Sequence, residues 1–600
     1  MRRRNDLIPR EDEKKLPAKL HKLFKYMKLV DWIFFVVSLV FIVSQVWLDL
    51  KLPDYMSQIT TLIQTSGAVS DIWNVGIMML LCAFGSLLSS VAVSFFSAKI
   101  AANFSKRLRK AMFDKVESFT LGEINAFSTA SLITRSTNDV SQVQMLIVMG
   151  LQVVVKAPVM AVWAITKIAG KQWQWSLATA ITVVIICLLL VIVMIATFPK
   201  FRRVQWLQDA INHTSRENLN GLRVVRAYNA EKYQEAKFKK ANSELLHNQL
   251  FANRVLVILS PFMSLATSCL SMSIYWIGAI LIMQTQSVAV RVDIFADMIV
   301  FMSYAMQVIM SFVMIIMVIM IMPRALVASG RINEVLETEP TIVDGEGVGE
   351  CEAEGEVEFR NVSFTYPGGS GSVLTDISFT AKKGETVAII GSTGAGKTTL
   401  VNLIPRLYDA SEGTVLVDGV DVKEYKLDEL YKRISYVSQR AFMFGGSIKE
   451  NVTFGKNGDE DKLDESLRIA QAQEFISELE EGTDASIAQG GTNFSGGQKQ
   501  RISIARALCR DAEIIIFDDT FSALDFKTDR ILRDELKHST VGITKFIVAQ
   551  RIGTIMSADK IIVLDNGKQV GTGTHKELLE TCEVYKQIAL SQLSEEELAI

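Results

Sequence analysis

Six long apolar segments constrain the fold of this 600-residue chain more than any other feature. Each is close to the ~20 apolar residues that one transmembrane helix requires. The expected spans are 31–50, 72–98, 148–169, 175–198, 255–284 and 294–322. A hydrophobic content of 49% and a mean hydropathy of +0.26 agree with them, because both exceed what a soluble protein needs. We therefore expect an all-α membrane domain in the first half of the chain.

Lysine and arginine residues concentrate in the segments expected on one side of the membrane. The N-terminal segment and the connections 99–147 and 199–254 are rich in both residues, whereas 51–71, 170–174 and 285–293 together carry three. Cytoplasmic loops of membrane proteins hold this excess. The distribution predicts an integral cell membrane protein, of the bacterial plasma membrane, with six spans and both termini in the cytoplasm.

The N-terminal segment 1–30 is charged and has no small-residue cleavage site before the first apolar run, so we expect no removable secretory signal. Within it, 11–28 is predicted to form an amphipathic helix at the membrane surface, with a solvated charged tail as the alternative. The residues on its apolar side are Leu16, Leu20, Leu23, Phe24 and Met27.

Charge and cysteine usage exclude two further classes of protein. The net charge of −2, without a basic stripe that carries interleaved aromatic residues, argues against nucleic acid as a partner. The six cysteines are scattered singly, which predicts reduced structural thiols rather than a zinc site or a disulfide scaffold. They are Cys82, Cys187, Cys269, Cys351, Cys509 and Cys582.

The pattern changes after Pro323. A short helix is expected over 325–337, followed by a Gly/Glu-rich stretch, 343–356, with the composition of a linker. Beyond it, short apolar strands alternate with helices, which is typical of an α/β domain. The expected domains are an N-terminal segment 1–30, a transmembrane domain 31–323, a linker 324–355 and an α/β domain 356–600.

A P-loop motif lies between an apolar strand and a predicted helix. Its backbone N–H groups can hold phosphates at the positive end of that helix, with Lys397 on the β- and γ-phosphates and Thr398 on Mg²⁺. The motif therefore predicts ATP and Mg²⁺ as ligands. The residues concerned are Gly391, Ser392, Thr393, Gly394, Ala395, Gly396, Lys397, Thr398 and Thr399.

Several ordered motifs around the P-loop resemble those of ABC-type ATPases. The signature motif of that family is matched by Phe494, Ser495, Gly496, Gly497 and Gln498. Its D-loop is matched by Ser522, Ala523, Leu524 and Asp525. The strand 514–518 resembles Walker B, so Asp518 is expected to help hold Mg²⁺. The resemblance further implies that Gln439 is the Q-loop glutamine, serving both Mg²⁺ and catalysis, and that Tyr366 stacks on adenine.

The first half of the chain also resembles exporters of this superfamily, of the multidrug-exporter type. The resemblance rests on 131–140 and 217–225, and it implies coupling helices near 123–127 and 214–220. The implied fold is a six-helix membrane domain followed by a RecA-like α/β P-loop domain, with an antiparallel β subdomain and an α-helical signature subdomain. Such a half-transporter is expected to hydrolyse ATP and to export a hydrophobic or amphipathic drug, lipid or peptide.

Two positions depart from the family at the catalytic site. Asp519 stands where the family has a glutamate that polarises the attacking water, and Gln550 stands where it has a histidine. Positioned acid–base assistance contributes roughly 10² to 10⁴ in rate, so slow or absent hydrolysis is expected at this chain's own P-loop. A neutral change, with Asp519 reaching the water after a small backbone shift, is the alternative. The segment 488–491 departs as well, where exporters often carry Glu-Arg-Gly.

The resemblance implies that each ATP lies between the P-loop of one subunit and the signature motif of another. Because the signature here is intact, we expect this chain to complete an active site on a second ABC half-transporter, in a heterodimer with one degenerate site. Two alternatives remain open: a homodimer with two slow sites, and a nucleotide-gated channel or regulator.

Methionines recur along the sixth apolar segment. Met298, Met302, Met306, Met310 and Met314 are spaced by four, followed by Met317, Met320 and Met322. This band either lines a substrate cavity or packs against neighbouring helices or lipid. Lys156, in the third span, either meets an anionic substrate or extends to the membrane interface.

Overall fold

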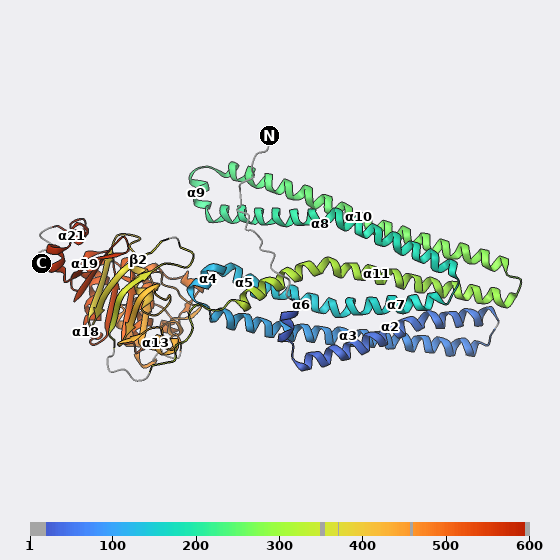
Figure 1. Cartoon of the computed structure of the whole chain (residues 1–600), viewed down its shortest axis with the longest axis horizontal. Helices are drawn as coiled ribbons and strands as arrows, with labels where there is room; N and C mark the ends of the chain where they lie inside the picture. Colours follow the sequence, from blue (N-terminus) through green and yellow to red (C-terminus); the bar gives the residue numbers. More distant parts are fainter. Residues whose placement is uncertain (1–19, 66, 349–354, 370, 456–459, 595–600) are drawn as a thin grey trace. The chain divides into compact units, whose positions relative to one another are not determined.

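The computed structural model describes residues 20–65, 67–348, 355–369, 371–455 and 460–594 (Figure 1). The chain forms two compact units. The membrane unit runs to Glu117 and resumes from Ala130 to Thr338, whereas the nucleotide unit combines Ser118–Thr129 with the chain from Glu339 onward. A piece of the expected membrane domain therefore belongs to the nucleotide unit.

The membrane unit contains the six expected spans, because six of its described helices are long and apolar enough to cross a membrane. They are Leu29–Gln64, Val69–Glu117, Thr129–Ala169, Trp173–Thr197, Glu231–Gln284 and Val288–Ile315. Several extend well beyond the apolar run, since charged residues outside lipid continue the same helical hydrogen bonding. The third consists of short pieces, α5 (Thr129–Thr134), α6 (Val140–Met149) and α7 (Lys156–Ala169), joined by π-helical turns.

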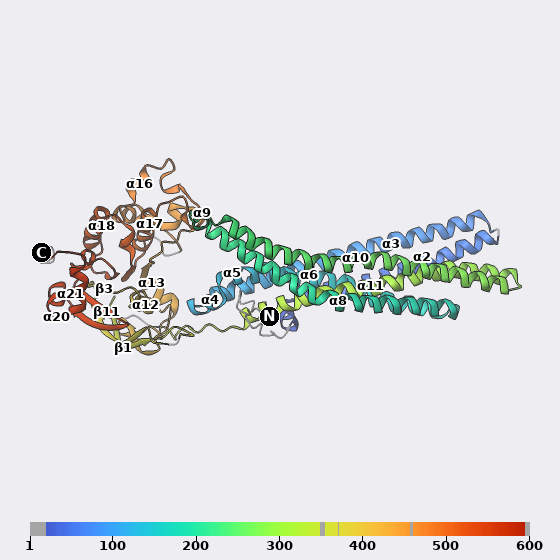
Figure 2. The same ribbon diagram turned by 90° about the horizontal axis from the view of Figure 1, so that it is seen from above.

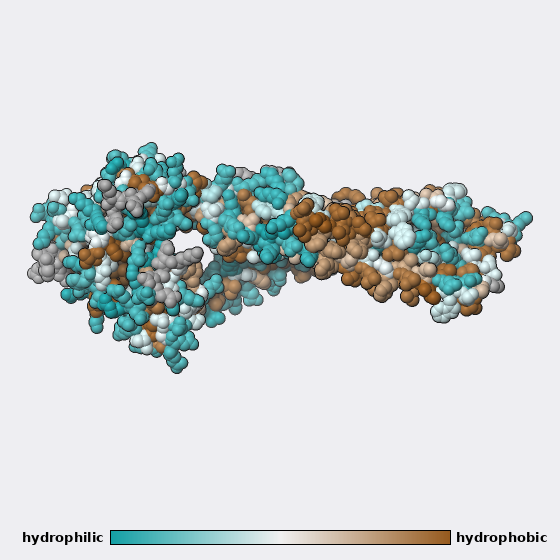
Figure 3. Space-filling model, turned by 90° about the horizontal axis from the view of Figure 1, so that it is seen from below, coloured by the Kyte–Doolittle hydropathy of each residue, from teal (hydrophilic) through white to brown (hydrophobic). Residues whose placement is uncertain are grey.

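Apolar side chains, brown in Figure 3, gather across the middle of the membrane unit, whereas hydrophilic residues are common toward both of its ends. Leu80 is 69% exposed and Ile195 is 71% exposed, although both are large aliphatic residues. A contiguous apolar surface of this size marks contact with lipid or another protein rather than with water. The nucleotide unit presents mainly hydrophilic residues in the same view.

Helices of the membrane unit pack in sequential antiparallel pairs (Figures 1 and 2). α2 (Leu29–Gln64) packs along α3 (Val69–Glu117), and α8 (Trp173–Asn220) packs along α10 (Glu231–Gln284). The short helix α9 (Leu222–Ala227) joins the second pair after Gly221. The second coupling helix was expected at 214–220, but those residues are the last turns of α8, and the separate short helix begins after Gly221 ends α8.

The start of the chain is described only from Leu20. A short helix, α1 (Leu20–Leu23), and a 3₁₀ turn (Phe24–Tyr26) precede α2, and Leu23 is buried. The first half of the expected amphipathic helix over 11–28, including Leu16, falls on residues 11–19, which lie outside the described part.

The expected short helix over 325–337 is the end of α11 (Val288–Glu337), which continues without a break past position 323. Ala325, Ile332 and Val335 are fully buried along this extension. Tertiary packing therefore keeps the helix going through a sequence that was expected to begin a linker, and the Gly/Glu-rich stretch starts only after it.

The nucleotide unit confirms the expected α/β domain and both subdomains. A six-stranded sheet has the order β12-β11-β3-β10-β9-β6, parallel except for the antiparallel pair β11–β12. An antiparallel sheet has the order β2-β1-β4-β5. The strands are β1 (Val357–Phe364), β2 (Leu374–Ala381), β3 (Thr386–Gly391), β4 (Glu412–Val417), β5 (Val420–Asp421), β6 (Ile434–Val437), β9 (Ile514–Asp518), β10 (Thr544–Val548), β11 (Lys560–Asp565) and β12 (Lys568–Gly573).

Short helices between β6 and β9 form the α-helical subdomain. They are α14 (Ile448–Val452), α15 (Leu463–Ile469), α16 (Gln473–Ser477) and α17 (Gly496–Leu508). A buried cluster that includes Leu467, Ile502 and Phe517 joins this subdomain to one face of the six-stranded sheet. The signature motif therefore has a rigid base.

The described cysteines form no disulfide with one another. They are Cys82, Cys187, Cys269, Cys509 and Cys582. Cys351 lies outside the described residues.

Candidate functional site

The predicted nucleotide residues gather at the carboxyl ends of four adjacent parallel strands. The P-loop follows β3, Gln550 follows β10, Asp518 ends β9 and Gln439 follows β6. In open α/β sheets this edge is where ligands bind, because loops from neighbouring strands converge there. Parallel register sets Val548 opposite Asp518, which brings the ends of β10 and β9 level.

The P-loop wraps the side chain of Lys397. Its Nζ donates hydrogen bonds to the backbone oxygens of Gly391 and Ser392, both at 2.9 Å. Gly396 precedes helix α12 (Lys397–Leu403) with φ of +95°, and a Cβ there would lie 2.7 Å from Leu374. Only glycine fits this position. The first N–H groups of α12 consequently face the loop without a side-chain cap, as phosphate binding requires.

Burial lowers the pKa of Lys397, while the carboxylates of Asp519 and Asp518 oppose that shift. The buried ammonium is therefore held at an electrostatic cost. An anionic triphosphate at this position would relieve the cost, because an opposite charge favours the protonated form.

Asp518 is almost completely buried and bonded on both oxygens. The Thr398 hydroxyl donates to Oδ1 at 2.9 Å, and the Tyr436 hydroxyl donates to Oδ2 at 3.0 Å. Burial raises the pKa of Asp518, although the two hydroxyls and Lys397 oppose that shift. The Tyr436 hydroxyl oxygen also lies 3.0 Å from Asn402 Oδ1, a second acceptor for the same proton, and burial together with Asp518 raises the pKa of its phenol.

Tyr436 is a site residue that the sequence analysis missed. It lies on β6, two positions before Ser438, and no motif distinguishes it from an ordinary strand tyrosine. The sequence offered one indication: Tyr436 lies on the strand that directly precedes Gln439, and that strand pairs with the Walker B strand. Its hydroxyl becomes a partner of Asp518 only once β6 and β9 pair.

The Asp519 carboxylate accepts hydrogen bonds from two glutamine side chains. Gln439 Nε2 donates to Asp519 Oδ2 at 3.0 Å, and Gln550 Nε2 donates to the same oxygen at 2.8 Å. Asp519 has a left-handed backbone, with φ of +47°, and its N–H donates to the Val548 oxygen at 3.0 Å. Aspartate tolerates this conformation better than most residues. We refer to Gln439, Asp519 and Gln550 as the amide clamp.

The residues present fit Mg²⁺ with a nucleotide. Thr398 and Asp518 are already in contact, and hydroxyl and carboxylate oxygens are ligands that Mg²⁺ prefers, directly or through water. Because Gln439 uses its amide nitrogen on Asp519, its amide oxygen remains as a further hard ligand. When bound, Mg²⁺ would neutralise charge on the phosphates.

Tyr366 lies half-buried beside the first turn of α12. Its hydroxyl is 2.9 Å from the Thr399 hydroxyl, and its ring packs edge-on against Phe364 and Tyr408. These contacts fix the ring close to the P-loop helix. The expected role of Tyr366 in stacking on adenine stays a prediction.

The signature motif begins helix α17. Ser495 caps the helix by accepting from the Gln498 N–H, and Gln498 accepts in return from the Ser495 N–H at 2.9 Å. Ser495 and Gly496 are exposed, and Phe494 packs on the helical subdomain. A Cβ on Gly497 would lie 3.4 Å from the Ala523 oxygen. The motif therefore contacts its own D-loop and presents its first turn to solvent.

The D-loop leads from Asp519 to helix α18 (Phe526–Ser539). The Ser522 hydroxyl donates to the Asp519 backbone oxygen at 2.8 Å, and Asp525 caps α18 by accepting from the Thr528 N–H at 3.0 Å. Leu524 is buried between them. The loop is thus attached to the amide clamp at one end and to a helix at the other.

The first expected coupling helix is α4 (Leu121–Phe127), within the nucleotide unit. Glu123 accepts hydrogen bonds from the N–H and the hydroxyl of Thr120 and of Thr341. Burial opposes ionisation of Glu123, but these four donors together hold its pKa below the ordinary value. Asn125 donates to the Tyr408 hydroxyl at 3.4 Å, and Tyr408 contacts Tyr366.

Comparisons with known proteins identify both parts of the chain. Residues 35–312 match the family described as ABC transporter transmembrane region, and residues 374–522 match the family described as ABC transporter. An ABC transporter ATP-binding protein of Mycobacterium tuberculosis is 38% identical, over 91% of this chain and 93% of the relative. The ABC transporter ATP-binding protein YfiB of Bacillus subtilis is 34% identical, over 93% and 96%.

Two further similarities concern a lipid flippase and a solved structure. The ATP-dependent lipid A-core flippase of Pseudomonas fluorescens is 31% identical, over 84% of this chain and 83% of the flippase. A bacterial Atm1-family ABC exporter, solved with ATP bound, superposes with a TM-score of 0.77 over 96% of this chain and 99% of that chain. At 20% identity, this last likeness concerns the fold.

Proposed function

The chain belongs to the ABC transporter family, and we propose that it is the degenerate-site subunit of a heterodimeric exporter. It has the exporter-type membrane region and the nucleotide-binding domain of that family, so it is an integral membrane protein that binds ATP. In our proposal its own P-loop site hydrolyses ATP slowly or not at all. Its signature motif completes an active site on a second ABC half-transporter.

The amide clamp carries this proposal. A water-polarising carboxylate must have a free oxygen directed at the attacking water. Here the Asp519 side chain is one methylene shorter than glutamate, and both glutamine amides bind its Oδ2. These two donors occupy one of its two oxygens and fix the orientation of the short carboxylate. Gln550 cannot supply the imidazole that the family has at this position, because a neutral amide does not exchange a proton near neutral pH.

The state of the signature motif supports the two-subunit arrangement. Ser495 and Gly496 are exposed at the start of a capped helix, and no described residue of the chain's own P-loop hydrogen-bonds them. Exposed N–H groups at a helix start are suited to a phosphate contributed from elsewhere. An intact signature together with an impaired catalytic site is the combination expected of one half of an asymmetric pair.

The transported molecule is proposed to be hydrophobic or amphipathic, as a drug, a lipid or a peptide would be. A relative of this chain is named as a lipid A-core flippase, which favours a lipid-like molecule within that class. In the proposed cycle, ATP closes the pair of nucleotide domains and the coupling helices transmit closure to the spans. Hydrolysis at the partner's site resets the cycle.

The orientation of the chain is part of the proposal. The lysine and arginine distribution supports cytoplasmic termini in a bacterial plasma membrane. An alkaline phosphatase fused after the C-terminus is expected to stay inactive, and one inserted at residues 170–172 is expected to be active. The reverse pattern would refute this orientation.

Steady-state ATPase measurements test the assembly. The chain is purified alone and together with a half-transporter, encoded beside it, that retains the glutamate and the histidine. We expect strong activity only in the pair. Vigorous activity of the chain alone would refute the impaired site. A stable pair of identical chains with slow turnover would instead identify a homodimer, and ATP-dependent conductance without uptake into inverted vesicles would identify a channel.

A further inference from the structure

A cavity of about 500 Å³ opens in the membrane unit beside α7 and α11. Four of its lining residues are the methionines Met302, Met306, Met310 and Met314. Their spacing of four places them along one face of α11. The methionine band therefore lines a cavity over these four positions.

Met298, the first methionine of the band, packs inside the protein and does not line the cavity. Met298 is only 6% exposed, and a Cβ on Gly278 would lie 2.4 Å from its Sδ, so this side chain packs against α10. Met310, by contrast, is 59% exposed. Flexible thioethers at an open wall adapt to apolar chains of different shape.

Lys156 is the one charged residue among the lining residues that the structure describes. It begins α7, inside the third span, where an ionisable group is costly and is retained for a function. Its Nζ lies 3.5 Å from Asp49 Oδ2, longer than the ~2.8 Å of a strong charge-assisted hydrogen bond. Asp49 does not line the cavity, and its Oδ1 accepts from the Ser86 hydroxyl. Asp49 therefore keeps a partner if Lys156 turns toward a ligand.

Gln307 adds an unused acceptor to the same wall. Its Oε1 is buried and has no hydrogen-bond partner among the described residues. A buried amide oxygen without a hydrogen-bond partner is unfavourable, so a donor from a bound molecule would stabilise it. The Lys156 cation and the Gln307 side chain thus line the same cavity as the apolar methionines.

We propose that this cavity binds an anionic amphiphile. The phosphate or carboxylate head pairs with Lys156, a hydroxyl or amide of the head region donates to Gln307, and the aliphatic tail lies along the methionines. The inference deepens the proposed function by naming the substrate class, and it rests on that function only for the step of transport. Binding itself needs neither ATP nor a second subunit's catalytic residues.

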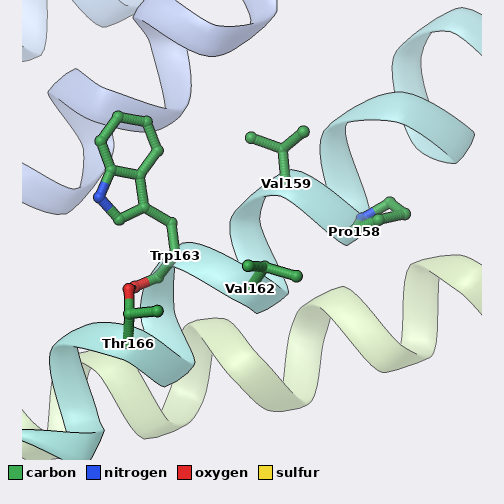
Figure 4. Close-up of a pocket in the computed structure, with 5 residues that line it drawn as sticks. All are labelled: Pro158, Val159, Val162, Trp163 and Thr166. Atoms are coloured by element: carbon green, nitrogen blue, oxygen red, sulfur yellow. The ribbon is translucent and has the colours of Figure 1, made fainter.

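A second hollow of similar volume, about 510 Å³, does not compete for this role (Figure 4). Its lining residues, which include Pro158, Val162 and Trp163, all come from α7. Thr166 supplies its one side-chain hydroxyl, which already donates to the Trp163 backbone oxygen at 2.7 Å. Neither a charge nor an unpaired acceptor is present there to select a head group.

Two lipids with the same acyl chain test the charge. The transporter, in nanodiscs of phosphatidylcholine without nucleotide, is titrated with oleoyl lysophosphatidic acid, which is anionic, and with 1-oleoylglycerol, which has the same acyl chain and glycerol but no phosphate. Lys156→Gln is expected to weaken binding of the anionic lipid by roughly 10- to 100-fold and to change the neutral lipid by less than about threefold, since one charge-assisted hydrogen bond is lost. Lys156→Arg should retain the preference, and Asp49→Asn should strengthen anion binding.

Matched controls separate this role from a structural one. Lys167 is also in the third span and is paired with Asp54 at 2.8 Å, but it does not line the cavity, so Lys167→Gln should leave both affinities unchanged. Met310→Asn should weaken both lipids, whereas Met78→Asn, at a similarly exposed methionine of α3, should weaken neither. If Lys156→Gln does not fold, comparison of Met310→Asn with Met78→Asn still tests whether the lipids bind in this cavity.

The proposal is overturned if Lys156→Gln weakens both lipids equally, if Lys167→Gln has the same effect, or if Met78→Asn matches Met310→Asn. These results are distinguishable from failure of the proposed function. Selective lipid binding without any ATP-driven transport would refute the exporter and leave the site. ATP-driven transport of another molecule, without selective binding, would refute the site and leave the exporter.

Discussion

Gln550 donates a hydrogen bond from Nε2 to Asp519 Oδ2 at 2.8 Å, so the two departures from the family pattern at the expected catalytic positions are in direct contact. Residues in contact do not contribute independently to activity. The two departures therefore form one altered site, and Gln439 joins it through the same carboxylate oxygen at 3.0 Å.

Asp519→Glu combined with Gln550→His is expected to raise hydrolysis at this site by roughly 10² or more, as positioned acid–base groups do. Asp519→Glu alone should gain less than about tenfold, because the Gln550 and Gln439 amides would still bind the carboxylate. Single-turnover cleavage of γ-labelled ATP measures the effect, in a pair whose other site is inactivated by a Glu→Gln change in the partner. A double variant as slow as the unmodified chain would mean that the amide clamp is not what limits turnover.

Glu123→Gln is expected to loosen helix α4 from the nucleotide unit by about 1–3 kcal/mol at neutral pH. The amide has one oxygen for four donors, and its NH₂ group would face N–H and hydroxyl donors of Thr120 and Thr341. The expected result is a lower midpoint of thermal unfolding in detergent. Glu480→Gln is the control, at an exposed glutamate with no hydrogen bond or ion pair to any described residue.

This loss should depend on pH in a defined direction. Because the pKa of Glu123 is held below its ordinary value of 4.5, ionised Glu123 stabilises the fold above that value and stops doing so as pH falls through the lowered pKa. The difference between the unmodified chain and Glu123→Gln should therefore be full at pH 7 and shrink as the pH falls below about 4. A constant difference down to pH 3.5 would contradict the assignment of these hydrogen bonds.

Tyr436→Phe is expected to weaken Mg²⁺-dependent ATP binding by about fivefold, equivalent to ~1 kcal/mol for one lost hydrogen bond. The Asp518 carboxylate loses its Oδ2 partner and keeps Thr398 on Oδ1. Binding measured in EDTA should change little. Tyr431→Phe is the matched control, at a tyrosine of helix α13 (Leu427–Arg433) whose hydroxyl bonds no described residue.

The pH dependence of this variant follows from Asp518. Its pKa is already raised by burial, and removing a hydrogen-bond donor to the carboxylate raises it further. Mg²⁺ binding needs the ionised form, so the affinity of the Phe variant should begin to fall at a higher pH than that of the unmodified chain. Identical pH profiles would show that Tyr436 does not act through Asp518.

Much of the fold could be predicted because its signals are local. Runs of about 20 apolar residues identify membrane helices without reference to anything else in the chain. The P-loop, the signature motif and the Walker B strand are short and ordered, and the comparisons confirm the ABC architecture that they predicted. The sequence predicted a helix over 325–337 but not that it continues α11 without a break, because that continuity depends on tertiary contacts such as those that bury Ala325 and Ile332.

By itself the sequence determined which chemical groups this protein has: six apolar spans, a phosphate-binding loop, an intact signature motif, and Asp519 and Gln550 in place of the usual pair. Only the tertiary structure decided which groups meet. It joined Gln550 and Gln439 to one oxygen of Asp519, bound Tyr436 to Asp518, and brought Glu123 to Thr341 across 218 residues of chain. The physical reason is that periodicity and motifs record contacts between near neighbours in sequence, whereas these hydrogen bonds depend on how strands pair and helices pack.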